Sequence, residues 1–318
     1  MKWHNRMSTV RNLPGGGPQG STFGLIEYDS QSNDNVDFLP EEDKYKFVDD
    51  LSILEIINLI AVGLSNYNFK EHVANDIGIN QLFLPSENIQ SQQFMDNISE
   101  WTDANKMMLN GNKSKVMVFN CTRNYQFATR IHLNDQQLET IHETKLLGTV
   151  ISSDLKWHAN TETLTQKGYQ RMTILRKLYE FDIPTEDLVV IYNQYIRSTL
   201  EFNSSVWYSS ITNEEREDIE RVQRIACQII LKDAYTSYKE ALEKLNLQNL
   251  SDRRQMLAGR FATKCANSDR FKDLFPLNAK EIEFRTNEKY AVRFAHTDRL
   301  KDSSIPAMQR LLNKQASK

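Results

Sequence analysis

Cysteine is scarce in this chain, with three residues among 318. Cys121, Cys227 and Cys265 lie too far apart to form a CxxC pair, and no histidine follows any of them at the spacing of a zinc finger. This cysteine usage is typical of a reducing compartment. We therefore expect an intracellular protein, located in the cytoplasm or the nucleus.

The sequence also lacks an apolar run of membrane-spanning length. The longest run, 53–64, is broken by Glu55 and Asn58 and falls short of the roughly 20 residues that cross a bilayer. The first ten residues, MKWHNRMSTV, lack the apolar segment of a secretory signal. We therefore expect no membrane partner.

An excess of positive charge is missing as well. The chain carries 39 lysines and arginines against 42 aspartates and glutamates, which gives a formal net charge of −3. Domains that bind nucleic acid indiscriminately are usually strongly basic, so any contact with nucleic acid would need local basic patches or metal ions. The length and the 40% hydrophobic content are ordinary for a globular protein of about two domains.

Strand signals dominate the sequence up to about residue 157. Aromatic and β-branched residues predict strands at 45–48, 115–120 and 146–151, and an alternating pattern predicts a hairpin over 131–141. After Asp50 two interpretations stay open: a helical face or a second strand of a hairpin.

Two further segments of this half have a different character. Phe94, Ile98 and Trp101 have the spacing of an amphipathic helix and predict one over 94–106. Residues 66–97 are polar with little periodicity, and they predict an irregular segment with at most short helices.

Beyond residue 160 the pattern becomes helical. Apolar residues form a stripe at helical spacing: Ile219, Val222, Ile225, Ala226 and Ile229. Glu214 to Glu217 lie at the N-terminal end, where the helix dipole favours acids, and Thr212 is a candidate N-cap. We therefore divide the chain into an α+β part, 1–158, and a mostly helical part, 159–318.

Asp49 and Asp50 are neighbouring acids at the end of a predicted strand, in the sequence FVDD. Two adjacent carboxylates repel each other unless a cation lies between them, and Mg²⁺ prefers such oxygen ligands. The pair is a candidate metal site. An exposed, solvated turn is the alternative.

Four glycines, Gly15, Gly16, Gly17 and Gly20, form a loop in GGGPQGSTFG. Backbone N–H groups in such a loop can face an anion, and the missing Cβ atoms let a nucleotide approach closely. No Gly-Lys-Ser/Thr follows, so it is not a Walker loop. A plain turn is the alternative.

Taken in order, several segments resemble one known family. They are GGGPQGSTFG (15–24), FVDD (47–50), LNGNKSKVMVFN (109–120), KLLGTVISSDLKWH (145–158) and the helical YIRSTLEFNSSVWYSSITNEEREDIERVQRIACQII (195–230). Together they are similar to successive motifs of reverse transcriptases from non-LTR retrotransposons. The resemblance covers nearly the whole chain. It implies an α+β fold, with a partial polymerase palm of antiparallel sheet and helices followed by a mostly α-helical thumb-like region.

The resemblance also implies roles for particular residues. Asp49 and Asp50 would be the catalytic residues and would bind Mg²⁺ for two-metal nucleotidyl transfer. The residues that would bind the nucleotide and the template are Gly17, Pro18, Gln19, Gly20, Ser21 and Lys113. The primer grip would be Leu146, Leu147 and Gly148. The implied partners are an RNA template and a DNA primer.

The implied thumb would grip duplex through basic residues of the helical part. Arg171, Arg176 and Lys177 are examples. A solvated helix face is an equally good interpretation of these three residues.

The main departure from the family is a missing acid. The family's earlier aspartate precedes the glycine loop, but residues 1–14 contain no Asp or Glu. We therefore expect a C-terminal fragment of an RNA-directed DNA polymerase that is inactive alone, with a companion chain as one source of the fingers and first palm strands. Two alternatives stay open: a non-catalytic remnant that binds nucleic acid or a partner, and a pseudogene product without a selected function.

Overall fold

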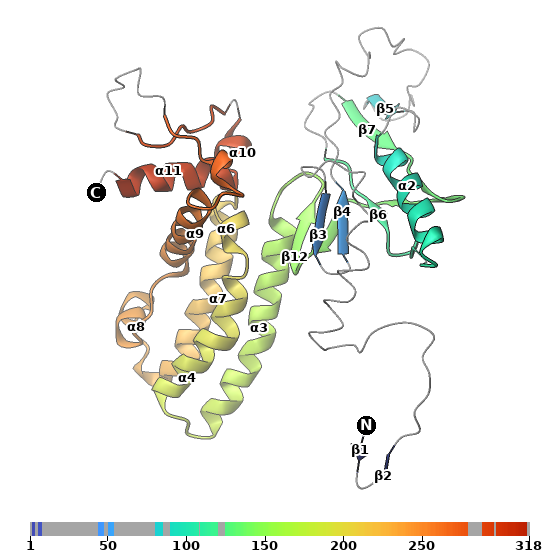
Figure 1. The fold of residues 1–318 in the computed structure, drawn as a ribbon. Helices are drawn as coiled ribbons and strands as arrows, with labels where there is room; N and C mark the ends of the chain where they lie inside the picture. Colours follow the sequence, from blue (N-terminus) through green and yellow to red (C-terminus); the bar gives the residue numbers. More distant parts are fainter. Residues whose placement is uncertain are drawn as a thin grey trace. The chain divides into compact units, whose positions relative to one another are not determined.

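The computed structural model describes residues 91–107, 109–119, 130–278, 288–295 and 297–316 in full. For residues 2–3, 6–7, 44–47, 50–53, 80–84, 90 and 125–129 it describes the backbone alone. The chain divides into two compact units, Met1–Ile141 and His142–Lys318. Strands and helices are both present, so the expected α+β class is confirmed (Figure 1).

The described residues of the first unit form short, paired strands and one long helix. The antiparallel pairs are β1 (Lys2–Trp3) with β2 (Arg6–Met7), β3 (Lys44–Phe47) with β4 (Asp50–Ile53), and β8 (His132–Leu133) with β9 (Gln136–Gln137). The parallel pairs are β5 (Asn80–Leu84) with β7 (Tyr125–Thr129) and β6 (Lys115–Val116) with β10 (Glu139–Thr140). The expectation of an antiparallel sheet is therefore wrong for these last two pairs.

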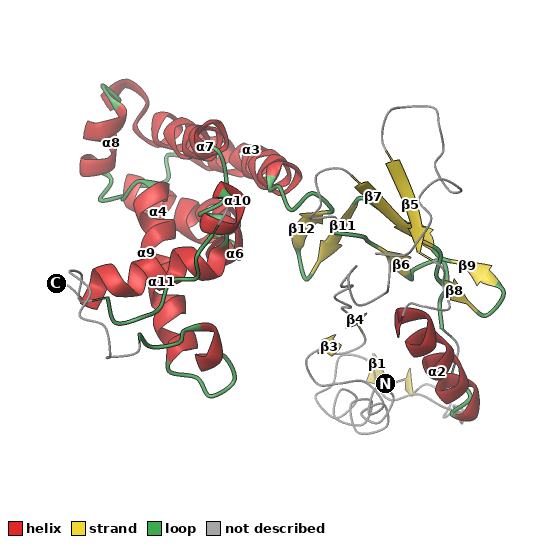
Figure 2. Ribbon diagram, turned by 90° about the horizontal axis from the view of Figure 1, so that it is seen from above, coloured by secondary structure: helices red, strands yellow, loops and turns green. Residues whose placement is uncertain are grey.

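Helix α2 (Gln90–Ala104) confirms the amphipathic pattern around Ile98, which is buried. It packs on the β8–β9 hairpin (Figure 2). The hairpin itself confirms the prediction for 131–141. The Gln92 amide accepts from the His132 N–H at 2.8 Å and donates to the His132 carbonyl at 3.0 Å. This double hydrogen bond satisfies both backbone groups of His132, a residue of β8.

Three predictions for this half need correction. Of the predicted strand 115–120, residues 115–116 form a strand, residues 117–119 are irregular, and residue 120 lies outside the described residues. The predicted strand 146–151 is interrupted by a turn at Leu147 and Gly148. The segment 66–97 contains strand β5 and the start of a 15-residue helix, where we expected an irregular segment with at most short helices.

The second unit begins with an antiparallel hairpin, β11 (Glu143–Leu146) and β12 (Thr149–Ser152). Helices follow: α3 (His158–Glu180), α4 (Thr185–Ile191), the π-helix η4 (Tyr192–Arg197), α5 (Ser198–Leu200), α6 (Ser204–Trp207), α7 (Asn213–Leu231), the 3₁₀ turn η5 (Lys232–Ala234), α8 (Tyr238–Lys244), α9 (Leu250–Ala266), the 3₁₀ turn η6 (Lys272–Leu274), α10 (Asp298–Lys301) and α11 (Ser304–Ala316). The predicted change to helical structure is confirmed.

Helix α7 forms where its sequence pattern predicts. Thr212 is the N-cap: its hydroxyl accepts from the Glu215 N–H, and the Glu215 carboxylate accepts from the Thr212 N–H. This reciprocal pair satisfies two otherwise unpaired donors of the first turn. Of the predicted stripe, Ile219, Val222 and Ala226 are buried, and Ile225 and Ile229 are partly buried and pack against the same core.

The core of the second unit is built around α3 and α7, which pack side by side (Figure 1). Gly168 of α3 lies against Val222 of α7, where a Cβ atom would come within 2.8 Å of Val222 Cγ1. A smaller cluster joins α9 to α11 through Ala262, Met308 and Leu312. In the part of the chain that the structure describes, no helix has the length and apolarity of a membrane span.

Candidate functional site

The Asp-Asp motif lies at a β-hairpin. Strand β3 ends at Phe47, which pairs with Asp50, the first residue of β4. Two residues of sequence, Val48 and Asp49, separate the paired positions, and both lie outside the described residues. The backbone after Asp50 is a hairpin strand up to Ile53, so the hairpin interpretation is confirmed there and the helical one is wrong.

The donor set at this hairpin has the chemistry that Mg²⁺ requires, because carboxylate oxygens are the hard ligands that this ion prefers. Asp49 and Asp50 supply two carboxylates. Within the described ranges there is no group of three His, Cys, Asp or Glu side chains that could hold a metal ion. Asp49 lies outside those ranges, and for Asp50 only the backbone is described.

The residues of the glycine loop, Gly17, Pro18, Gln19, Gly20 and Ser21, also lie outside the described residues. Their predicted role in nucleotide and template binding therefore stays a prediction.

Lys113 lies in a turn, and its side chain is exposed. Its backbone N–H donates to the Asn110 carbonyl at 3.0 Å and to Asn110 Oδ1 at 3.2 Å. The next basic residue, Lys115, forms an ion pair with Glu139 across the β6–β10 pair. Of these two lysines, Lys113 therefore offers the more accessible positive charge to an anion.

The segment proposed as a primer grip forms the tip of the β11–β12 hairpin. Leu146 pairs with Thr149, and the two residues between them have positive φ angles, 45° at Leu147 and 88° at Gly148. Positive φ at both central residues is the mark of a type I′ turn, whose twist matches that of the flanking strands. The Leu146 and Leu147 side chains are 38% and 47% exposed, so the tip presents apolar surface.

Two asparagines of the helical part hold this hairpin in place. Asn203 Nδ2 donates to Thr149 Oγ1 at 2.8 Å, and the Val150 N–H donates to Asn160 Oδ1 at 3.2 Å. The Phe202 ring lies against Gly148 and is itself 45% exposed. We call Leu146, Leu147 and Phe202 the hairpin-tip surface.

One of the basic residues expected in the thumb, Arg171, has a structural role. Arg171 of α3 donates from Nη1 to the Tyr195 carbonyl at 2.6 Å and to Thr199 Oγ1, and its guanidinium lies 4.4 Å from the Tyr195 ring centre. It therefore joins α3 to η4 and α5. Arg176 and Lys177 are exposed on α3, as a role in surface binding requires.

Sequence reasoning missed a partly buried ionic cluster that joins the C-terminal end of α5 to α9. Arg253 donates to both oxygens of Glu201, through Nε and, at 3.1 Å, through Nη2. This hydrogen bond with Glu201 raises the pKa of Arg253, whereas burial lowers that of Arg197, which lies 3.8 Å from Glu201. The partners are separated by 52 residues, so no local pattern indicates the pair.

Arg254, the next residue, is fully buried. Its Nε, Nη1 and Nη2 have no hydrogen-bond partner among the described residues, and its guanidinium lies 5.8 Å from the Trp207 ring centre. Loss of hydration lowers the pKa of Arg254 to about 10, although Glu220 and Glu201 favour the charged form. Such a buried, unsatisfied charge opposes folding.

A chain of polar side chains crosses the same core. The Tyr192 hydroxyl donates to Gln223 Oε1, Gln223 Nε2 donates to the Tyr238 hydroxyl at 2.8 Å, and Tyr238 donates to Glu220. Burial is the main cause that raises the pKa of both tyrosines. The tyrosines therefore stay protonated and act as hydrogen-bond donors that fix the helices.

Comparison with protein-family models, with curated proteins and with solved structures found no match to this chain.

Proposed function

We propose that this chain derives from the reverse transcriptase of a non-LTR retrotransposon and contains part of its palm and its thumb. The observation that carries the proposal is the pairing of Phe47 with Asp50, because it puts FVDD at a β-hairpin. An Asp-Asp pair at such a hairpin is what the resemblance implies for a polymerase palm. A solvated pair in an ordinary loop would not need strands on both sides.

In this proposal the carboxylates of Asp49 and Asp50 would hold Mg²⁺. Mg²⁺ held there would activate the primer 3′-hydroxyl and stabilise the leaving pyrophosphate. Lys113, exposed in its turn, would offset the negative charge of the triphosphate. The glycine loop, with Gln19 and Ser21, would position the nucleotide opposite its template base.

The hairpin-tip surface would contact the primer strand. Its apolar side chains suit sugar and base surfaces, and its anchoring through Asn203 and Asn160 keeps the tip in one place relative to its unit. Arg176 and Lys177 of α3 would contact phosphates of the RNA–DNA hybrid.

A carboxylate cage for two metal ions needs more than Asp49 and Asp50, and residues 1–14 offer no further acid. We therefore propose that these 318 residues, tested by themselves, bind a primer–template without extending the primer.

The proposal is tested by binding and extension on one substrate, a DNA primer annealed to an RNA template. We expect binding that weakens steeply with salt, is stronger with Mg²⁺ than with EDTA, and loses this Mg²⁺ dependence in Asp49→Asn. Asp135→Asn is the matched control, because Asp135 also lies between the paired strands of a hairpin, β8 and β9.

Two results would contradict parts of the proposal. Hybrid binding that is indifferent to Mg²⁺ and to Asp49→Asn would favour the non-catalytic nucleic-acid-binding remnant. Primer extension abolished by Asp49→Ala would show that the chain is catalytically complete, against our expectation.

A further inference from the structure

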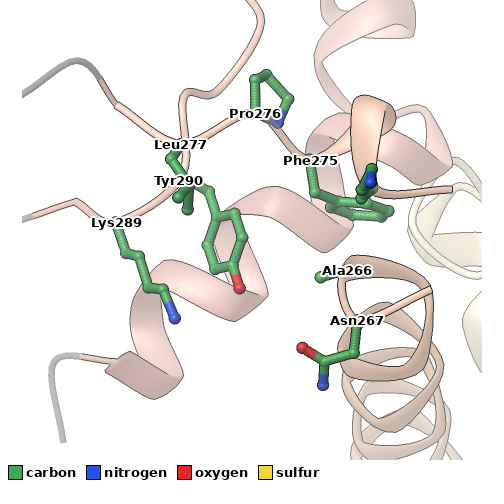
Figure 3. A pocket seen from close by; sticks show the side chains of 8 residues that line it. Ala266, Asn267, Phe275, Pro276, Leu277, Lys289 and Tyr290 are labelled. Atoms are coloured by element: carbon green, nitrogen blue, oxygen red, sulfur yellow. The ribbon is translucent and has the colours of Figure 1, made fainter. Parts of the chain in front are cut away.

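A pocket of about 400 Å³ opens in the second unit beside the end of α9 (Figure 3). Phe275, Pro276 and Tyr290 supply apolar and aromatic walls, and the polar lining includes Asn267, Lys272 and Lys289. In Figure 3 the Lys289 and Tyr290 side chains extend in the same direction, with Asn267 across from them. This volume is in the range of small-ligand sites.

The aromatic wall is fixed by hydrogen bonds to α11. The Tyr290 N–H donates to Asn313 Oδ1 at 2.8 Å, and Asn313 Nδ2 donates to the Tyr290 carbonyl at 2.9 Å. A β-bridge joins Tyr290 to Leu277, and the Asn278 N–H donates to the Lys289 carbonyl at 3.0 Å. The pocket is therefore largely formed before a ligand enters, which lowers the entropy lost on binding.

Two cations flank this wall. Lys289 Nζ lies 5.3 Å from the Tyr290 ring centre, so one end of the pocket combines an aromatic face with a positive charge. Lys272 is bound to Asp269 at 3.0 Å, but Asp269 is fully exposed, and surface pairs of this kind are weak. An anion can therefore compete with Asp269 for Lys272.

We propose that this pocket binds one unpaired nucleotide of a single-stranded nucleic acid. The base would pack against Tyr290 and Pro276, its edge would meet the Asn267 amide, and a neighbouring phosphate would meet Lys289 and Lys272. Stacking on aromatic side chains beside cations is the usual chemistry of single-strand binding. A paired base cannot enter, because its faces are covered within the duplex stack.

This inference rests on the proposed function, since it names a second nucleic-acid contact in the same chain. It assigns the contact to the end of α9, away from the Asp-Asp hairpin in the sequence. It also makes a separate prediction: the pocket distinguishes single strands from the RNA–DNA hybrid.

The first test measures the affinity of the whole chain for a fluorescent 12-nucleotide single-stranded RNA and for the RNA–DNA hybrid. Lys289→Gln should weaken single-strand binding roughly fivefold and leave hybrid binding unchanged. Lys301→Gln is the control, because Lys301 is exposed on α10 in the same unit and does not line the pocket. The inference would be overturned if Lys289→Gln and Lys301→Gln lowered the affinity for single-stranded RNA equally. It would also be overturned if Lys289→Gln lowered the affinity for both substrates equally, or if the chain did not bind single-stranded RNA.

Photocrosslinking gives a second measurement that does not depend on a variant. A single-stranded RNA that carries one 4-thiouridine should crosslink to Tyr290, Phe275 or a neighbour of these residues, mapped by peptide mass spectrometry. Crosslinks confined to other peptides would refute the pocket. If hybrid binding and its Mg²⁺ dependence persist in that case, the proposed function survives the failure of this inference.

Discussion

The Phe202 ring lies so close to Gly148 that a Cβ atom on residue 148 would come within 2.9 Å of Phe202 Cε1. Gly148 also has a φ of 88°, which other residues adopt only with strain. The turn of the β11–β12 hairpin is therefore set both by its own backbone and by a side chain 54 positions further along the chain. The hairpin and the helices of its unit should be stabilised together.

Gly148→Ala tests this dependence. The new methyl group must displace the Phe202 ring while the backbone keeps a positive φ, so we expect a loss of about 1–3 kcal/mol in the free energy of unfolding. Urea denaturation followed by circular dichroism measures it. Gly259→Ala in α9 is the control: its Cβ meets only the end of Gln315, and alanine favours a helix. Equal effects of the two substitutions would contradict the role of Phe202.

Leu147→Asn separates stability from binding. Leucine with a φ of 45° is strained, whereas Asn-Gly is the preferred sequence of a type I′ turn. We expect this change to stabilise the second unit by roughly 0.5–1 kcal/mol. If the hairpin-tip surface contacts primer, the same change should weaken binding to the RNA–DNA hybrid. A gain in stability with unchanged hybrid binding would remove Leu147 from the primer-contact proposal.

Arg254→Met should stabilise the protein, because methionine fills a similar space without a buried charge. We expect a gain of about 1–3 kcal/mol in the free energy of unfolding, measured in urea at pH 7. The neighbouring Arg253→Met should have the opposite sign, since it leaves Glu201 without its bidentate partner. A loss of stability in Arg254→Met would mean that the guanidinium has an acceptor.

The advantage of Arg254→Met should also depend on pH. The pKa of Arg254 is about 10 in the folded protein, against 12.5 for an ordinary arginine. Below pH 10 both folded and unfolded states hold the proton, so the penalty of burial is complete. Between the two values the folded state releases its proton first, and the penalty shrinks as pH rises. The stability difference between the variant and the original chain should therefore narrow above pH 10.

Cys227 should resist alkylation in the folded protein. Burial in α7, with a smaller effect of Glu220, raises the pKa of its thiol to about 12, and the thiolate is the reactive form. Iodoacetamide at pH 8, followed by peptide mass spectrometry, should label Cys227 in urea and leave it largely unmodified in buffer. Equally fast labelling in both conditions would contradict the buried position.

Local patterns explain which parts of the fold could be predicted. The stripe on α7 and its Thr212 cap are read from adjacent residues, and the structure confirms both. The β8–β9 hairpin follows in the same way from alternation around Asn134 and Asp135. These elements are specified by residues within a few positions of one another.

Elements that depend on distant partners were missed. Strand β5 pairs in parallel with β7, 45 residues away, and its own sequence gives only a weak strand signal. The run LLGTVI has the pattern of a single strand, but the chain turns at Leu147 and Gly148, where the Phe202 ring lies against Gly148. The sequence around Arg171 indicates an exposed basic residue, because its partners Tyr195 and Thr199 lie in other helices, η4 and α5. In each case the deciding contact is tertiary.

The features of the candidate site also divide into those that the sequence indicates and those that only the structure shows. The resemblance names Asp49, Asp50, Lys113 and the hairpin tip, and the structure gives the backbone of β3 and β4 and the exposure of Lys113 and Leu147. Arg254, which has no hydrogen-bond partner in the described part of the chain, has no sequence signature. The pocket beside Tyr290 has none either, since its walls come from a helix and separate loops.

The most direct test of the central claim is a Mn²⁺ titration followed by electron paramagnetic resonance, with the chain bound to the RNA–DNA hybrid. Mn²⁺ binds to the same kind of oxygen ligands as Mg²⁺. The signal of free Mn²⁺ decreases when the ion binds to the protein, so the decrease measures the bound fraction. We predict a bound Mn²⁺ signal that is lost in Asp49→Asn and Asp50→Asn and retained in Asp135→Asn. Binding that is the same in all of these chains would contradict a metal site at the Asp-Asp hairpin.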